Sequence, residues 1–221
     1  MQSAMNCRAL LFDLDGVLVD SAECVRRICT EWAILRRLDP DSVLKWSQGR
    51  RVQDTVRAVA PHLDVDAEVK VLVDMEANTT DGLHPVAGSH ALLASLPPNA
   101  WAVVTSGARP VALLRLRHVG LPIPRTLITG DDVERGKPDP EGYLAATRAL
   151  GYPPDECVVV EDAPAGVAAA RAAGMRSIGV AGTFPRAAIA EASVVIDALR
   201  HLSVSPTLDR LSLSFDLSSG Y

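Results

Sequence analysis

The sequence has few aromatic residues, few cysteines and no long hydrophobic run. Aromatic side chains make up 4% of its 221 residues and form no stripe on which single-stranded nucleic acid would stack. The apolar runs 157–160 and 165–170 are far shorter than the roughly 20 residues of a membrane span, and the N-terminal residues lack the apolar core of a signal peptide. The four cysteines form no CxxC pair and suit a reducing compartment as small buried residues. We therefore expect a cytoplasmic protein with no membrane partner.

The charge balance is mildly acidic. Lys and Arg number 22 against 27 Asp and Glu, and the net charge of -5 argues against a nucleic-acid partner while leaving room for a local phosphate pocket. Lysine is scarce, with only Lys45, Lys70 and Lys137, so a lysine in an unusual setting is easy to notice. The five histidines have no metal-ligand spacing, and no zinc site is expected.

Short apolar runs alternate with helical apolar spacing from about residue 87 onward, which predicts a doubly wound parallel sheet. The expected strands are 9–12, 101–104, 126–128, 157–160 and 177–180. Between residues 21 and 85 the spacing is helical, which predicts a helical insert. The alternation of polar and apolar residues over 202–217 indicates a terminal hairpin or edge strands. The predicted fold is α/β, with a Rossmann-like parallel sheet as its core.

Polar residues follow the first two strands of this predicted sheet. Asp13 and Asp15 come directly after the first strand, and the turn at Gly16 can bring both around one ligand. Thr105-Ser106-Gly107 follows the second strand and offers hydroxyls and free backbone amides of the kind that hold phosphate oxygens. Taken alone, each motif is equally compatible with an ordinary helix cap or solvated loop.

Two further polar motifs follow later in the chain. Lys137 lies in a loop just before a predicted helix, where it supplies a compact cation. Glu161 and Asp162 follow the strand at 157–160, and adjacent carboxylates at a sheet edge favour a hard cation such as Mg2+. Because ligands of doubly wound sheets bind at the carboxyl ends of the strands, all four motifs are expected at one edge. Together they predict a pocket for a phosphoryl group bound to Mg2+.

The four motifs occur in an order that resembles the haloacid dehalogenase superfamily. They are the string FDLDGVLVD at 12–20, Thr105-Ser106-Gly107, Gly136-Lys137-Pro138 and Glu161-Asp162. The segments 49–57 and 101–109 make the chain similar to the 2-deoxyglucose-6-phosphatase and glycerol-3-phosphatase type of sugar phosphatases. The resemblance implies a core of residues 1–19 and 86–221 and a small α-helical cap domain of residues 20–85. It also implies a small phosphorylated sugar or polyol as the partner, and a monomer or small homo-oligomer.

The resemblance implies a role for each motif residue. Asp13 would be the nucleophile that forms an aspartyl-phosphate, and Asp15 would be the acid that protonates the leaving alkoxide and the base that activates water. Thr105 would bind a phosphate oxygen, and Lys137 would neutralise charge on Asp13 and the phosphoryl group. Four residues would hold Mg2+: Asp13 and Asp162 by their carboxylates, Asp15 by its backbone carbonyl, and Glu161 directly or through water.

Substrate choice is expected to depend on the cap. Gly49, Arg50 and Arg51 lie in a predicted cap loop, where they are expected to contact substrate together with Ser106 and Gly107. A solvated basic turn is the other interpretation of this loop.

Two alternatives to a phosphatase stay open. Val17 after Gly16 is more similar to β-phosphoglucomutases, whereas Val52 and Val25 replace the arginine and histidine of the mutase-type cap. A non-catalytic phosphate-binding module is the second alternative.

Overall fold

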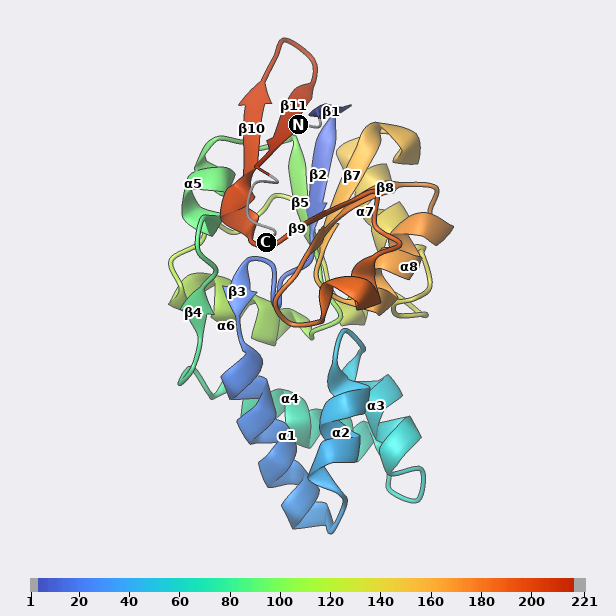
Figure 1. Cartoon of the computed structure of the whole chain (residues 1–221). Coiled ribbons are helices and arrows are strands. Elements are labelled where there is room, and N and C mark those ends of the chain that lie inside the picture. Colours follow the sequence, from blue (N-terminus) through green and yellow to red (C-terminus); the bar gives the residue numbers. More distant parts are fainter. Residues whose placement is uncertain (1–3, 217–221) are drawn as a thin grey trace.

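A six-stranded parallel sheet forms the centre of the computed structural model, which describes residues 4–216 (Figure 1). Its strands lie in the order β6-β5-β2-β7-β8-β9. Their bounds are β2 Ala9–Phe12, β5 Trp101–Val104, β6 Leu127–Ile128, β7 Cys157–Glu161, β8 Arg176–Val180 and β9 Val194–Ile196. All five predicted strands are present, and β9 is an additional one. The α/β fold with a Rossmann-like parallel sheet is thereby confirmed.

The two faces of this sheet are covered by different helices. Successive strand residues point to opposite faces, so Leu10 and Phe12 pack with one set of helices and Ala9 and Leu11 with the other. The first set is α5 (Ser89–Ala94) and α6 (Arg109–His118), and the second is α7 (Glu141–Leu150) and α8 (Pro164–Ala172). Short 3-10 helices lie at Gly130–Asp132, Pro154–Glu156, Arg186–Ile189 and Leu199–His201.

The winding of the sheet reverses at β2. From β2 the chain proceeds outward through β5 to β6, and then returns to the other side of β2 to build β7, β8 and β9. The carboxyl ends of β2, β5 and β7 are therefore adjacent at a switch point, which is where open α/β sheets bind ligands.

A separate helical insert follows β2 and lies below the sheet in Figure 1. It consists of α1 (Ala22–Arg36), α2 (Pro40–Ser47), α3 (Val52–Val59) and α4 (Val65–Ala77). The chain leaves for the insert along β3 (Val19–Asp20) and returns along β4 (His84–Pro85), and the two strands pair antiparallel. The predicted domain limit at residues 19/20 falls within β3 and that at 85/86 lies at the end of β4, and the division into two domains stays a prediction.

A second sheet packs the chain ends against the core. It is formed by β1 (Ala4–Cys7), β11 (Leu211–Phe215) and β10 (Leu202–Pro206), with β11 in the middle. The hairpin predicted over 202–217 is present up to residue 216, whereas residue 217 and the predicted core residues 1–3 and 218–221 lie outside the described residues. All four cysteines are buried and free. No helix within residues 4–216 is long and apolar enough to cross a membrane.

Truncating a side chain of the central strand tests this packing. Leu11 of β2 is fully buried on the face of the sheet that α7 and α8 cover, so Leu11→Ala should lower the free energy of unfolding by about 2–5 kcal/mol. Leu208 is fully exposed in the hairpin turn, and Leu208→Ala should change the stability by less than about 0.5 kcal/mol. Urea unfolding followed by circular dichroism measures both variants. Equal losses of unfolding free energy in Leu11→Ala and Leu208→Ala would contradict this packing.

Candidate active site

The predicted motif residues meet at the carboxyl ends of three neighbouring strands. Asp13 follows β2, Thr105 follows β5, and Glu161 ends β7 with Asp162 directly after it. Lys137 reaches the same place from the loop that precedes α7. These five side chains are all buried, although four of them are ionisable. A buried cluster of this kind is stable only when its charges are paired.

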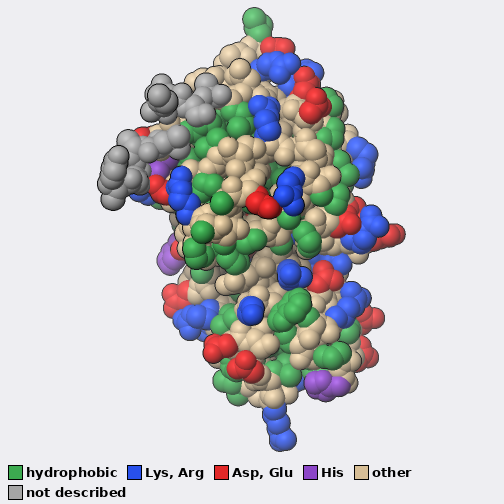
Figure 2. Space-filling model, turned by 45° about the vertical axis from the view of Figure 1, so that its right-hand side comes forward, with side chains coloured by type: hydrophobic (Ala, Val, Ile, Leu, Met, Phe, Trp, Pro, Cys, Tyr) green, Lys and Arg blue, Asp and Glu red, His purple; other side chains and the backbone are tan. Residues whose placement is uncertain are grey.

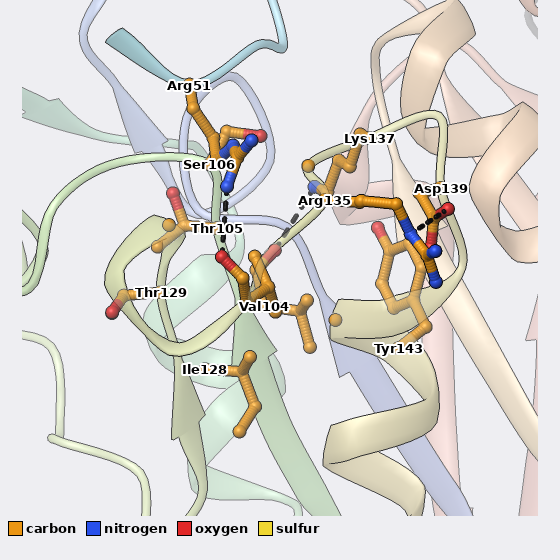
Figure 3. Close-up of a pocket in the computed structure, with 14 residues that line it drawn as sticks. Arg51, Val104, Thr105, Ser106, Ile128, Thr129, Arg135, Lys137, Asp139 and Tyr143 are labelled. Carbon is orange, nitrogen blue, oxygen red and sulfur yellow. Dashed lines mark hydrogen bonds and ion pairs between the residues drawn. The ribbon is translucent and has the colours of Figure 1, made fainter. Parts of the chain in front are cut away.

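The Lys137 ammonium is at the centre of the cluster. It donates hydrogen bonds to Asp13 Oδ1, to Glu161 Oε1 at 2.6 Å and to the Val104 carbonyl oxygen at 3.1 Å, the last of which is drawn in Figure 3. Burial by itself lowers the pKa of Lys137, but the facing carboxylates Asp13 and Glu161 outweigh it and hold the pKa well above its usual value. The lysine is therefore charged and is held by three acceptors at the ends of three different strands.

Glu161 uses both carboxylate oxygens in hydrogen bonds to the protein. Oε1 also accepts from the Tyr143 hydroxyl at 2.9 Å, and Oε2 accepts from the backbone N–H groups of Asp162 and Ala163 at 2.9 Å each. Tyr143 of α7 packs on the face of the sheet that Cys157 and Val159 line, and strand alternation places Glu161 on that face too. The neighbouring Asp162 has a side-chain hydrogen bond with Thr183.

Three carboxylates of the cluster have oxygens within 4.8 Å of one another, those of Asp13, Glu161 and Asp162. Two unit charges about 4 Å apart repel by roughly 4 kcal/mol at an effective dielectric of about 20. Burial raises the pKa of both Asp13 and Asp162, and the neighbouring carboxylate of Glu161 adds to this effect. Buried, oxygen-only ligands with excess negative charge fit a hard divalent cation such as Mg2+.

The loop after β5 contributes hydroxyls and amides beside these carboxylates. The Thr105 hydroxyl oxygen accepts from the Gly107 backbone N–H at 3.0 Å, which leaves its hydrogen available to a ligand. The Ser106 hydroxyl donates to the Gly49 carbonyl oxygen of the helical insert at 3.0 Å. This loop therefore faces the carboxylates with one residue and contacts the insert with the next.

A cavity of about 360 Å³ lies between the insert and the sheet edge. Asp13, Asp15 and Asp162 line it from the core, and its opposite wall includes apolar side chains of the insert such as Val43 and Leu72. The volume is in the range of pockets that hold small metabolites. These carboxylates thus face a cavity large enough for a small metabolite.

The three predicted insert residues lie in different places. Gly49 and Arg50 line the cavity, and the Arg50 guanidinium lies 4.9 Å from the centre of the Trp46 ring. Arg51 is buried instead, bound to the Asp54 carboxylate at 2.8 Å and to the Val133 carbonyl oxygen of the core at 2.9 Å. It lines a smaller pocket that also contains Lys137 and Thr105 (Figure 3).

Three site residues were not found from the sequence. Arg115 of α6 donates to Asp15 Oδ1 at 2.7 Å and to Glu76 of α4 at 2.7 Å, and Ser21 also donates to Asp15 Oδ1, at 2.6 Å. One signal for Arg115 was available, because it occupies the apolar side of α6 one turn after Val111. Nothing local distinguishes Glu76 or Ser21.

A doubly wound sheet with buried carboxylates and one lysine at its carboxyl edge is typical of α/β proteins that bind ligands at this edge. Residues 10–180 match the haloacid dehalogenase-like hydrolase family. Hexitol phosphatase A of Escherichia coli (strain K12) is 40% identical over 206 residues, which cover 91% of this chain and 95% of that protein. The chain belongs to the haloacid dehalogenase-like hydrolase family.

Further relatives agree with this assignment. Glycerol-1-phosphate phosphohydrolase 2 of Saccharomyces cerevisiae is 33% identical over 216 residues, or 91% of this chain and 85% of that protein. The solved structure of CbbY from Rhodobacter sphaeroides in complex with phosphate has a TM-score of 0.73 at 25% identity, covering 88% of this chain and 95% of that one. The prediction of a phosphatase-like member of this superfamily is confirmed.

The turn at Gly16 offers a test of the site geometry. A Cβ atom added to Gly16, whose φ is +80°, would lie 1.9 Å from Asp162 Oδ2, so Gly16→Ala should displace this carboxylate. We expect phosphatase activity to fall by at least about 100-fold, as for a lost electrostatic group. Gly151→Ala is the matched control, because Gly151 has a φ of +76° and nothing within 4 Å of the added atom. A Gly16→Ala enzyme as active as Gly151→Ala would contradict this geometry.

Proposed function

We propose that the protein is a Mg2+-dependent phosphatase that hydrolyses small phosphorylated sugars or polyols through an aspartyl-phosphate. The observation that carries the proposal is the Asp13–Lys137 pair beside Asp162 at the floor of the cavity between core and insert. A buried carboxylate paired with a lysine and open to a cavity is suited to attack a phosphoryl group.

In the first step, an Asp13 carboxylate oxygen attacks phosphorus and the ester bond to the substrate oxygen breaks. Lys137 neutralises negative charge on Asp13 and on the incoming phosphoryl group, which lowers the repulsion between them. Thr105 donates its hydroxyl hydrogen to a phosphoryl oxygen, because its hydroxyl oxygen already accepts from the Gly107 backbone N–H.

Asp15 acts on the leaving group and then on water. As a protonated acid it transfers its proton to the departing alkoxide oxygen, and the resulting carboxylate removes a proton from water. The activated water attacks the phosphorus of the aspartyl-phosphate, which releases inorganic phosphate and restores Asp13. Asp15 is suitably placed because it lines the same cavity as Asp13.

The donor set fits Mg2+. Asp13 and Asp162 would hold the ion by their carboxylates and Asp15 by its backbone carbonyl. Both Glu161 oxygens already accept hydrogen bonds, so we place Glu161 beside the ion, where it completes the acidic cluster and holds Lys137. When bound, Mg2+ supplies charge stabilisation for the phosphoryl group in transfer.

The insert acts as a cap that selects the substrate. Gly49 and Arg50 line the cavity and are placed to contact hydroxyl or phosphoryl oxygens, with Ser106 and Gly107 on the core side. Arg51 bonds to Asp54 of the cap and to the Val133 carbonyl oxygen of the core, which suits a role in holding the cap against the core. Arg51 would thereby support the substrate contacts of the neighbouring cap residues.

Support for the substrate class comes from relatives whose names specify hexitol phosphatase and glycerol-1-phosphate phosphohydrolase. Surface charges of both signs are interspersed over the described residues visible in Figure 2, which fits a small metabolite better than a nucleic acid as partner. A cytoplasmic location and a monomeric or small homo-oligomeric state are parts of the proposal, and the buried free thiols suit the former.

Phosphate release from a panel of hexitol, hexose, deoxy-sugar and glycerol phosphates tests the function. We expect turnover that needs Mg2+ and is strongest on a polyol or sugar phosphate. Asp13→Asn removes the nucleophile and should lower kcat by at least about 10⁴-fold. Interconversion of glucose phosphate isomers without phosphate release would favour a mutase, and tight phosphate binding without turnover would favour a binding module.

The metal role of Asp162 is tested separately. Asp162→Asn removes one charged oxygen ligand, so we expect weaker Mg2+ binding by isothermal titration calorimetry and a kcat lowered by about 100-fold or more. Asp155→Asn, an exposed aspartate just before β7, is the control and should bind Mg2+ as the unmodified protein does. Unchanged Mg2+ affinity in Asp162→Asn would exclude this residue as a ligand.

A further inference from the structure

A buried arginine connects the helical insert to Asp15. Arg115 donates from Nη1 to Asp15 Oδ1 and from Nη2 to Glu76 Oε2, each at 2.7 Å. Its side chain is 4% exposed, and that of Glu76 is 15% exposed. Arg115 belongs to core helix α6 and Glu76 to insert helix α4, so the guanidinium bridges the two parts of the protein beside the cavity.

The two hydrogen bonds to the Asp15 side chain converge on one oxygen. Within residues 4–216, Ser21 at 2.6 Å and Arg115 at 2.7 Å both donate to Oδ1, and no bond is made to Oδ2. A protonated carboxyl has one acceptor oxygen and one that carries the hydrogen. Because Oδ1 is occupied as an acceptor by two donors, the proton is directed to Oδ2.

Arg115 is costly to bury at this place. It interrupts the apolar side of α6, where Val111, Ala112 and Leu116 are buried. A buried guanidinium must be fully paired, and the pKa of Arg115 is raised because the carboxylates Asp15 and Glu76 outweigh the desolvation. Burial in turn raises the pKa of Glu76, although Arg115 opposes this effect. Without the arginine, Glu76 would be left in this place without a paired cation.

From this geometry we propose that Arg115 is a positioning residue that orients Asp15 as the proton donor, and that Glu76 of the insert holds Arg115 in that orientation. The inference rests on the proposed role of Asp15. Contact between α4 and Arg115 makes the orientation of the acid depend on the insert lying against the core. The proton is then presented when the cavity is closed over the substrate.

The leaving group of the substrate provides a specific test. Protonation matters for an alkyl phosphate such as sorbitol 6-phosphate, whereas p-nitrophenolate leaves without a proton. The parameter kcat/KM reports the step in which the leaving group departs and is independent of later hydrolysis. Arg115→Lys should lower kcat/KM on sorbitol 6-phosphate by at least about 10-fold and on p-nitrophenyl phosphate by less than about 3-fold. Glu76→Gln should also lower the ratio of kcat/KM on sorbitol 6-phosphate to kcat/KM on p-nitrophenyl phosphate, by a smaller factor than Arg115→Lys does.

Matched controls are available on the same helices. Arg117→Lys on α6 and Asp74→Asn on α4 change exposed residues, and both should keep the ratio of the unmodified enzyme. An equal loss on the two esters in Arg115→Lys, or no loss on either, overturns the inference, because a general structural defect affects both alike.

A second readout needs no turnover. Amide hydrogen exchange of residues 13–21 should be faster in Arg115→Lys than in Arg117→Lys, since the Asp15 loop loses its bridge to α6. Unchanged exchange would overturn the inference even if the enzyme hydrolyses neither ester. Failure of the unmodified protein to release phosphate, by contrast, contradicts the proposed function alone.

Discussion

The structure depends on the placement of one ammonium group among buried carboxylates. Lys137 pairs with Asp13 and Glu161 and also binds the carbonyl oxygen of Val104. Each acceptor belongs to a different strand end, so the lysine connects the ends of β2, β5 and β7 at the edge where the sheet reverses. Without this cation, the carboxylates would have to take up protons or separate, and either change would disable Asp13, the proposed nucleophile.

The adjacent acids Glu161 and Asp162 lie in different environments at the end of β7. Glu161 faces the side covered by α7, where Tyr143 and two backbone amides satisfy it, whereas Asp162 faces the turn at Gly16 and the cavity. Both oxygens of the first carboxylate are therefore used by Lys137, Tyr143 and two backbone amides. The second interacts with the Thr183 hydroxyl and lines the cavity, where we propose that it binds a cation. The two adjacent acids thus differ in environment because Glu161 is the last residue of β7 and Asp162 belongs to the turn after it.

Much of the core could be predicted because its signals are local. Apolar runs bounded by polar turns identified β2, β5 and β7, and the rule for parallel sheets brought Asp13, Thr105 and Asp162 to one edge. The bridge from Asp15 through Arg115 to Glu76 could not be predicted in this way. Its members are 100 and 39 residues apart in the chain, and their contact depends on how the insert lies on the core. For the same reason, sequence did not separate Arg50 in the cavity from its neighbour Arg51 at the contact with the core.

Lys137 and Arg115 each lie between carboxylates, but the geometry around the two cations differs. The Lys137 acceptors converge on one point, which suits a compact ammonium with three hydrogens on one nitrogen. Asp15 and Glu76 lie on different parts of the protein, and the planar guanidinium of Arg115 contacts them through two separate nitrogens. A lysine therefore suits the rigid sheet edge, where the partners are fixed by strand pairing. An arginine suits the contact with the insert, because its guanidinium binds both Asp15 and Glu76. The position of Glu76 on the insert can thereby influence the orientation of Asp15.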